Sequence, residues 1–185
     1  MPALVLPTPE VAVSFRAAMA EFRVEGRGSA DDHSMVGHEL RTFGSSWGDD
    51  AGFRAFVTAL RAQSEEDTPR AEDFVPCTTW WYVEGDAYLG RIALRHRLNE
   101  RLREIGGHIG YDVRPTARRR GHATAMLAAV LPHAADMGID RALVTCDAAN
   151  IGSRLVIEHN GGVLEDDRQG MLRYWVPTRP GRATP

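Results

Sequence analysis

The sequence contains no lysine: all 22 of its basic residues are arginine, and 25 acidic residues give it a formal net charge of -3. A negative net charge argues against a general nucleic-acid binder, because affinity for a phosphate backbone calls for a basic surface. We attribute the arginine bias to the genomic composition of a GC-rich bacterium. Arginines that serve a ligand must therefore be recognised by their local clustering.

Cysteine is also scarce, since only Cys77 and Cys146 occur, each inside a strand-like run. Two separated cysteines suggest neither a disulfide framework nor a zinc site, and we expect no metal cofactor. No run approaches the roughly 18 apolar residues that a membrane helix needs, and the N-terminus lacks the basic and then apolar layout of a secretory signal. We therefore expect a cytoplasmic protein that does not enter the membrane.

The N-terminal part predicts two helices and a loop. Thr8 is a candidate N-cap, and apolar residues recur at helical spacing from Val11 to Phe22. A second helix is indicated by apolar residues from Phe53 to Leu60. Between them, residues 26–50 are rich in Gly, Ser, Asp and His, which predicts a long loop with room for a short turn of helix. With 185 residues, 43% of them hydrophobic, the chain has the size of a single domain.

The remaining chain alternates between strand and helix patterns. Residues 77–83 and 87–96 are rich in β-branched and aromatic residues, and the turn between them indicates a hairpin. The elements predicted after it are a short helix at 99–105, a strand at 108–113, a helix at 123–137, a central strand at 141–147, a helix at 150–161 and closing strands at 163–164 and 171–176. This order predicts an α/β fold with a mixed sheet, antiparallel at first and with a parallel crossover in the middle.

The most informative segment is the run Arg118-Arg119-Arg120-Gly121-His122-Ala123-Thr124, which joins a strand to an amphipathic helix. Amides at a helix start have no partner within the helix, and the helix dipole adds partial positive charge there. Gly121 permits close approach to the main chain, and the arginines add planar donors suited to phosphate oxygens. The segment predicts a diphosphate site, and the other interpretation is a solvated, arginine-rich helix start.

The spacing Arg118-x-x-Gly121-x-Ala123, in this setting, resembles the acyl-CoA signature of the GNAT superfamily of N-acetyltransferases. Residues 95–99 and 106–111 also resemble a bacterial GNAT subgroup with no settled substrate. The resemblance is firmest over residues 107–162. It implies a GNAT-like α/β fold with a mixed, mostly antiparallel central sheet, a splayed parallel pair in the middle and helices on both faces.

The resemblance also implies acetyl-CoA as cosubstrate. Residues 118–124 would hold its pyrophosphate, and the main chain of Tyr111, Asp112 and Val113 would pair with its pantetheine arm. The Val113 N–H would polarise the thioester carbonyl as an oxyanion donor. Asn150 matches the family asparagine that touches the arm, and Ser153 lies one helical turn further on.

One position departs from the family pattern. Many members carry a tyrosine seven residues after the asparagine, where its hydroxyl protonates the departing thiolate, but this chain has Ile157 there. Three interpretations remain: the thiolate leaves unassisted, since a thiol is already a fair leaving group; another residue acts; or the protein binds acyl-CoA without turnover.

His108 and His96 are the candidate general bases. An amine must lose a proton before it attacks, and histidine titrates in the useful range. By strand alternation each histidine could point into a pocket between the sheet and the N-terminal helices. The other interpretation of each is a hydrogen-bonded structural histidine. Residues 80–82, Trp-Trp-Tyr, could line a site for a cationic acceptor or pack in the core.

Together these features predict an acetyl-CoA-dependent N-acetyltransferase that transfers its acetyl group directly to an amine in a ternary complex. The alternative is a non-catalytic acyl-CoA-binding or sensor module. The N-terminal helices and the loop at 26–50 would border the acceptor site within one domain over residues 1–185. The acceptor would be a small-molecule or peptide amine, and the closing strand pair could support a homodimer.

Overall fold

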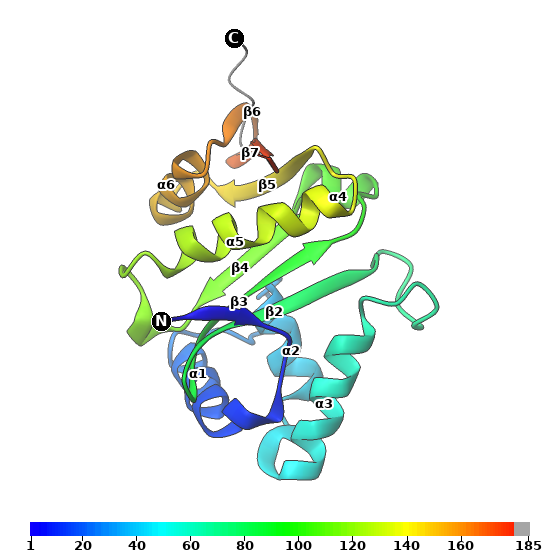
Figure 1. Cartoon of the computed structure of the whole chain (residues 1–185), viewed down its shortest axis with the longest axis vertical. Helices are drawn as coiled ribbons and strands as arrows, with labels where there is room; N and C mark the ends of the chain where they lie inside the picture. The colour runs from blue at the N-terminus through cyan, green and yellow to red at the C-terminus, as the bar shows by residue number, and fades with distance from the viewer. Residues whose placement is uncertain (180–185) are drawn as a thin grey trace. The chain divides into compact units, whose positions relative to one another are not determined.

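The computed structural model describes residues 1–179. Figure 1 shows its helices and strands. In chain order they are β1 (Ala3–Val5), η1 (Pro9–Val11), α1 (Ala12–Val24), α2 (Met35–Phe43), η2 (Ser46–Gly48), α3 (Asp50–Ala62), β2 (Cys77–Glu84), β3 (Ala87–Arg95), α4 (Glu100–Glu104), β4 (Ile109–Val113), η3 (Pro115–Ala117), α5 (His122–Asp136), β5 (Arg141–Asp147), α6 (Ile151–His159), β6 (Val163–Arg168) and β7 (Met171–Pro177). The predicted hairpin, the strands and the helices α1, α3, α4, α5 and α6 are confirmed, whereas β1 was not foreseen.

The described chain divides into two compact units. The N-terminal unit comprises residues 1–68, 79–91 and 112–122, and the C-terminal unit comprises residues 69–78, 92–111 and 123 onward. Strands β2, β3 and β4 contribute residues to both units. The single domain expected over residues 1–185 stays a prediction.

The strands form a four-stranded sheet in the order β1-β2-β3-β4 and a three-stranded antiparallel sheet in the order β5-β7-β6. The α/β fold with a mostly antiparallel sheet is thus confirmed. Strand β5 was expected to be central, but it is an edge strand of its sheet and β7 takes the centre. The edge of β5 that does not pair with β7 lies beside the residue before β4, because the His108 N–H donates to the Leu143 carbonyl of β5 over 2.7 Å. The two strands belong to different sheets, as expected of a splayed pair.

Aromatic side chains form the core of the N-terminal unit. Phe15 of α1 lies at its centre, and the ring centroids of Trp47, Phe56, Trp81 and Tyr88 lie 4.9 to 5.5 Å from its own. Trp81 is fully buried there, so this ring packs in the core and does not line an open acceptor site. Helices α1, α2 and α3, drawn from blue to cyan in Figure 1, supply most of this core.

The prediction of a long loop with room for a short turn of helix over residues 26–50 underestimated the helix, because α2 is nine residues long and η2 follows it. Helix α2 is short and contains a glycine, a histidine and a glutamate, which hid its period. Val36 and Leu40, four residues apart, are nevertheless buried in the core. Ser34 was the available signal, since its hydroxyl caps the helix by accepting the Gly37 N–H over 3.0 Å, a typical N-cap bond.

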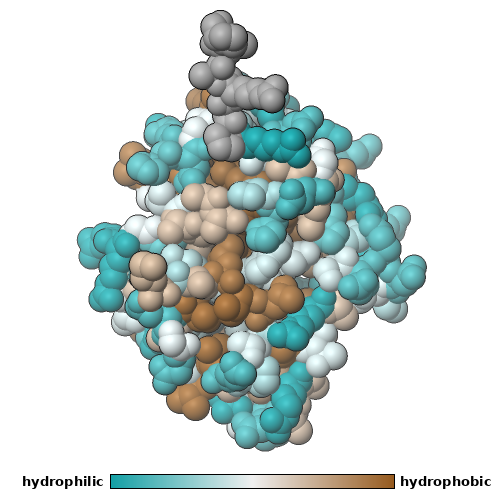
Figure 2. All heavy atoms as spheres, in the orientation of Figure 1, coloured by the Kyte–Doolittle hydropathy of each residue, from teal (hydrophilic) through white to brown (hydrophobic). Residues whose placement is uncertain are grey.

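In Figure 2, hydrophilic residues form much of the visible face. Exposed apolar side chains such as Val13, Phe74 and Leu155 also occur, and scattered exposure of this kind is normal in globular proteins. Among residues 1–179, no helix is both long enough and apolar enough to cross a membrane.

Candidate functional site

The arginine-rich turn has the backbone of an anion site. Arg119 adopts a φ of 60° and Gly121 a φ of 80°, and α5 begins directly after them at His122. A positive φ in a non-glycine residue is costly and clusters at functional sites, and such turns aim successive amides in one direction. The amides of residues 119–121 donate no hydrogen bond to any other residue of the described chain. They are therefore available to an anion at the start of α5.

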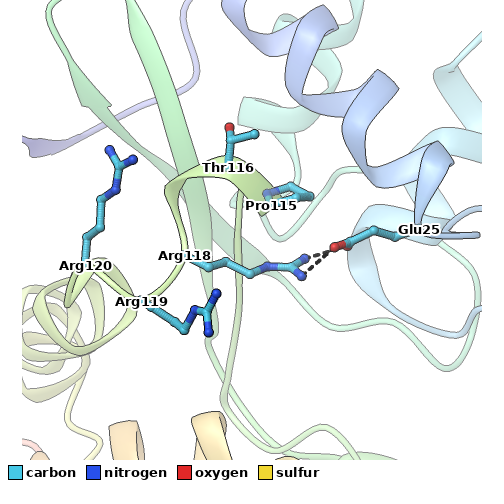
Figure 3. Close-up of a pocket in the computed structure, with 6 residues that line it drawn as sticks. All are labelled: Glu25, Pro115, Thr116, Arg118, Arg119 and Arg120. Carbon is cyan, nitrogen blue, oxygen red and sulfur yellow. Dashed lines mark hydrogen bonds and ion pairs between the residues drawn. The ribbon is translucent and has the colours of Figure 1, made fainter.

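The side chains around this turn line a pocket of about 610 Å³, a size that suits small-molecule ligands. Its lining residues are Glu25, Pro115, Thr116, Arg118, Arg119 and Arg120. Figure 3 shows Arg118 reaching toward Glu25 at the end of α1, whereas Arg119 and Arg120 extend in other directions. All of these residues belong to the N-terminal unit.

Arg118 is engaged more fully than the sequence suggested. Its Nη1 and Nη2 donate to the two carboxylate oxygens of Glu25, each over 2.7 Å, and its Nε donates to the Val113 carbonyl over 3.1 Å. Arg119 and Arg120 are exposed and make no ion pair with a residue of the described chain. They are therefore the arginines most readily available to phosphate, while Arg118 fixes the turn to α1 and β4.

Strand β4 presents main-chain groups at a sheet edge. It is the terminal strand of the four-stranded sheet, and the Arg114 N–H donates to the Leu89 carbonyl of β3 over 2.9 Å. Successive amides of a strand point to opposite sides, so the Val113 N–H points away from β3. This orientation suits the predicted oxyanion donor, and that role stays a prediction.

In the C-terminal unit, the predicted arm-binding residues form a hydrogen-bonded group. Asn150 caps α6, since its Oδ1 accepts the Ser153 N–H over 3.0 Å. The Tyr111 hydroxyl lies 2.7 Å from the Ser153 hydroxyl. The hydroxyl of Tyr111, a residue of β4, thus contacts α6 at Ser153. Ser153 lies one helical turn before Ile157, which occupies the position of the missing family tyrosine. Ile157 itself is fully buried.

Cys146 joins the same group through Ser153 but is a poor nucleophile. Burial raises the pKa of its thiol, although a hydrogen bond with Ser153 and the charge of Arg154 lower it. The thiolate is the nucleophilic form of cysteine. A covalent acyl-cysteine is therefore disfavoured.

The two candidate bases have structural partners. His108 is buried, and its Nδ1 accepts the Leu143 N–H over 2.9 Å. Burial, with the charges of Arg103 and Arg95, lowers the pKa of His108 to about 4. Its accepting nitrogen is thus occupied and its affinity for a proton is weak, which weighs against a general base. The Nε2 of His96 lies 2.8 Å from the Thr78 hydroxyl.

Sequence inspection missed a buried polar cluster in the N-terminal unit. Arg91 of β3, which is 3% exposed, pairs with Glu39 of α2, and Arg27 pairs with both Asp32 and Asp112. Of these residues, only Asp112 was a predicted site residue, and only its main chain was expected to bind a ligand. The available signal was an arginine within the otherwise apolar strand β3, because an arginine there needs a carboxylate from elsewhere. Within residues 1–179, no group of three or more His, Cys, Asp or Glu side chains is placed to hold a metal ion.

Comparisons with known proteins gave one family-model match and several solved structures of similar fold. The model of the acetyltransferase (GNAT) domain matches residues 30–163. No curated protein matches the chain significantly. Many solved structures share its fold, and three of them are described here. The ribosomal-protein-S5-alanine acetyltransferase from Vibrio fischeri has a TM-score of 0.66 and 12% identity, over 96% of this chain and 93% of that one. Mycobacterium smegmatis RimJ in complex with CoA-disulfide has a TM-score of 0.64 and 17% identity, over 95% and 81%. The microcin C7 self-immunity acetyltransferase MccE in complex with acetyl-CoA and AMP has a TM-score of 0.62 and 13% identity, over 95% and 92%.

Proposed function

This chain belongs to the GNAT acetyltransferase family, and we propose that it transfers the acetyl group of acetyl-CoA directly to an amine. The observation that carries the proposal is the turn at residues 118–124. It combines free amides, a helix start and two arginines without ion-pair partners in the described chain. These are the groups that a diphosphate requires.

Each part of the cosubstrate has proposed partners in this chain. The amides of residues 119–124, with Arg119 and Arg120, hold the pyrophosphate. The outward main chain of Tyr111 to Val113 pairs with the pantetheine arm, and Asn150 and Ser153 contact that arm. The Val113 N–H donates to the thioester oxygen as negative charge develops on it.

The transfer itself is one displacement. The amine nitrogen attacks the thioester carbon, a C–N bond forms and the C–S bond breaks, and the nitrogen releases a proton to solvent water. The CoA sulfur leaves as a thiolate and takes up a proton, for which we propose the Tyr111 hydroxyl as donor. The Tyr111 oxygen then regains a proton from solvent, so that one proton passes in all from the amine to the thiol. Holding both substrates together supplies much of the rate. The raised pKa of the Cys146 thiol supports direct attack over a covalent acyl-enzyme.

A second candidate function rests on Ile157. Because this buried isoleucine replaces the family tyrosine, the protein could bind acyl-CoA as a sensor without transferring the acyl group. Binding without turnover would separate this function from catalysis.

The test measures thiol release from acetyl-CoA by the purified protein. The acceptors are amino acids, polyamines, aminoglycosides and peptides with free N-termini, the last because four structural neighbours are described as acetyltransferases of ribosomal proteins. We expect thiol release that depends on one class of acceptor, and a rise in melting temperature with acetyl-CoA alone. Stabilisation without thiol release would favour the sensor, and the absence of both would reject the acyl-CoA proposal.

A further inference from the structure

Residues Gly106, Gly107 and His108 form a corner between α4 and β4 that lies against β5. The His108 N–H donates to the Leu143 carbonyl over 2.7 Å, and its Nδ1 accepts the Leu143 N–H over 2.9 Å. One histidine thus bonds both main-chain groups of a β5 residue, and its imidazole nitrogen takes the place of a main-chain carbonyl. A protonated nitrogen cannot accept a hydrogen bond, so the arrangement requires the neutral tautomer with its proton on Nε2.

The two glycines of the corner are held by their own main-chain bonds. The Gly106 N–H donates to the Thr145 hydroxyl of β5 over 2.9 Å, and the Gly107 N–H donates to the Leu102 carbonyl of α4 over 2.9 Å. Nη1 of Arg95, from β3, donates to the Gly106 and Gly107 carbonyls over 2.8 and 3.0 Å. The corner is therefore fixed by α4, β3 and β5 together, all within the C-terminal unit.

Glycine at position 107 lets the corner touch the main chain of β5. Gly107 has a φ of 58°, and a Cβ atom there would lie 2.3 Å from the Leu143 carbonyl oxygen. Any other side chain would push the two strands apart, and the positive φ favours glycine independently. The contact at the corner is thus direct, from main chain to main chain.

The same corner explains why β4 and β5 do not pair along their length. They are joined by the helix α5, the usual connection between parallel neighbours. After the bond from His108 to Leu143, the next bond of a parallel ladder would run from the Thr145 N–H to the His108 carbonyl. That carbonyl instead accepts the Arg95 N–H of β3 over 2.8 Å. The pairing therefore does not continue into a ladder, and the two strands belong to different sheets.

Beyond the corner, each strand directs main-chain groups to the side on which the other strand was met. The His108 carbonyl bonds β3, so by strand alternation the Tyr111 N–H points away from β3. On β5 the Leu143 main chain faces the corner, so the main chain of Thr145, two residues on, faces the same side. A ligand that carries amide groups of its own can bond to strands presented in this way.

We propose that His108 is a positioning residue for the cosubstrate, which ends the pairing of β4 with β5 at the corner and fixes the spacing of the two strands between which the pantetheine arm lies. It acts through Leu143 and does not touch the reacting atoms. The proposal rests on the proposed function, which places the arm along Tyr111. It gives His108 a role other than that of general base.

The experiment compares two fragments of the cosubstrate by calorimetric titration. Pantetheine carries the arm without the diphosphate, and adenosine diphosphate carries the diphosphate without the arm. The variants are His108→Leu, which has no acceptor, and His108→Asn, whose side-chain oxygen accepts from near the position of Nδ1. His159→Leu, at an exposed histidine of α6, is the control. Hydrogen exchange of the Leu143 amide, measured by NMR, reports the bond itself.

We expect His108→Leu to bind pantetheine about tenfold more weakly than the wild type, because the arm then pays for ordering the two strands. Its affinity for adenosine diphosphate should not change, and its Leu143 amide should exchange faster. His108→Asn and the control should match the wild type in all three measurements. Unchanged pantetheine binding by His108→Leu would overturn the proposal, as would an equal loss for both fragments or a failure of His108→Asn to restore binding.

If His108→Leu does not fold, a milder pair of variants decides. Thr145→Val removes the acceptor of the Gly106 N–H at nearly constant shape, and Thr145→Ser retains it. Thr145→Val should weaken pantetheine binding selectively, and Thr145→Ser should not. Equal pantetheine affinities in these two variants would count against the corner.

Binding of whole acetyl-CoA to the wild type separates this proposal from the proposed function. If the wild type binds acetyl-CoA but the variants show no selective loss for pantetheine, only the role of His108 is rejected. If the wild type does not bind acetyl-CoA, the proposed function is rejected, and the positioning role falls with it.

Discussion

Glu25 and Arg118 form a two-point ion pair, in which Oε1 accepts from Nη1 and Oε2 accepts from Nη2, each over 2.7 Å. The pair lines the same pocket as Arg119 and Arg120. A carboxylate in a phosphate site repels the ligand and also occupies an arginine that would otherwise face it. Glu25 ties the turn to α1, and if the turn binds the phosphates as proposed, this carboxylate limits the affinity for them.

The substitution Glu25→Gln should raise affinity for CoA about two- to fivefold. Removing the charge ends the repulsion of the phosphates and frees the Nη donors of Arg118. The expected gain in affinity is modest because the ion pair is partly exposed and is screened by solvent. Calorimetric titration of CoA measures the effect, with the exposed Glu10→Gln as the charge control. Weaker binding by Glu25→Gln would mean that the ion pair shapes the site and that this outweighs any competition with phosphate.

A double substitution of Arg119 and Arg120 by alanine should weaken CoA binding by at least about tenfold, since hydrogen bonds between charged groups are worth roughly 1.5–3 kcal/mol each. Pantetheine lacks the diphosphate, so its affinity should not change. Titrating both ligands into the same protein tests this. An equal loss for pantetheine would place these arginines outside the phosphate site. Arg118→Ala with Arg120→Ala should also weaken CoA binding, but Arg118→Ala additionally frees Glu25.

The arginine turn was predictable because its signal is local. Strand, turn and helix start are consecutive in sequence, and both the helix start at His122 and the positive φ of Gly121 agree with that prediction. Family membership was likewise correctly inferred from the same residues. Local sequence could not predict that Arg118 forms an ion pair, because its partner Glu25 lies 93 residues away in the chain.

The buried polar cluster was hidden for the same reason. Arg27 and Asp112 are 85 residues apart, and Glu39 lies on a helix that composition assigned to a loop. For His108, strand alternation predicted which face the side chain lies on, but it could not reveal that the Leu143 N–H donates to its Nδ1. Long-range pairing, and not local pattern, decides which polar side chains remain free to react.

Tyr111→Phe should lower kcat about 100-fold and leave the KM for acetyl-CoA nearly unchanged. A general acid contributes roughly 10²- to 10⁴-fold, and we expect the low end because a thiolate is a fair leaving group. Steady-state kinetics with the best acceptor measure the change, and Tyr174→Phe, whose hydroxyl bonds Glu158, is the control. An unchanged kcat would reject Tyr111 as the general acid, so that the thiolate leaves unassisted or takes its proton from another residue.

His108 should make the protein less stable in mild acid. Its folded pKa is about 4, whereas an unfolded histidine has a pKa near 6.5, so above pH 6.5 both states are neutral and there is no penalty. As the pH falls from 6.5 toward 4, the unfolded chain binds a proton that the folded protein does not. The free energy of unfolding then drops by about 1.4 kcal/mol per pH unit from this group.

His108→Asn removes the titrating group, and urea unfolding at pH 7 and pH 5 tests the consequence. Between these values the wild type should lose about 2 kcal/mol more stability than the variant. His159→Asn, at an exposed histidine of α6, should behave like the wild type. Equal losses in the wild type and His108→Asn would show that His108 takes up its proton in the folded state at an ordinary pKa. In that case its imidazole would again be available as a general base near neutral pH, and the objection to its catalytic role would fall.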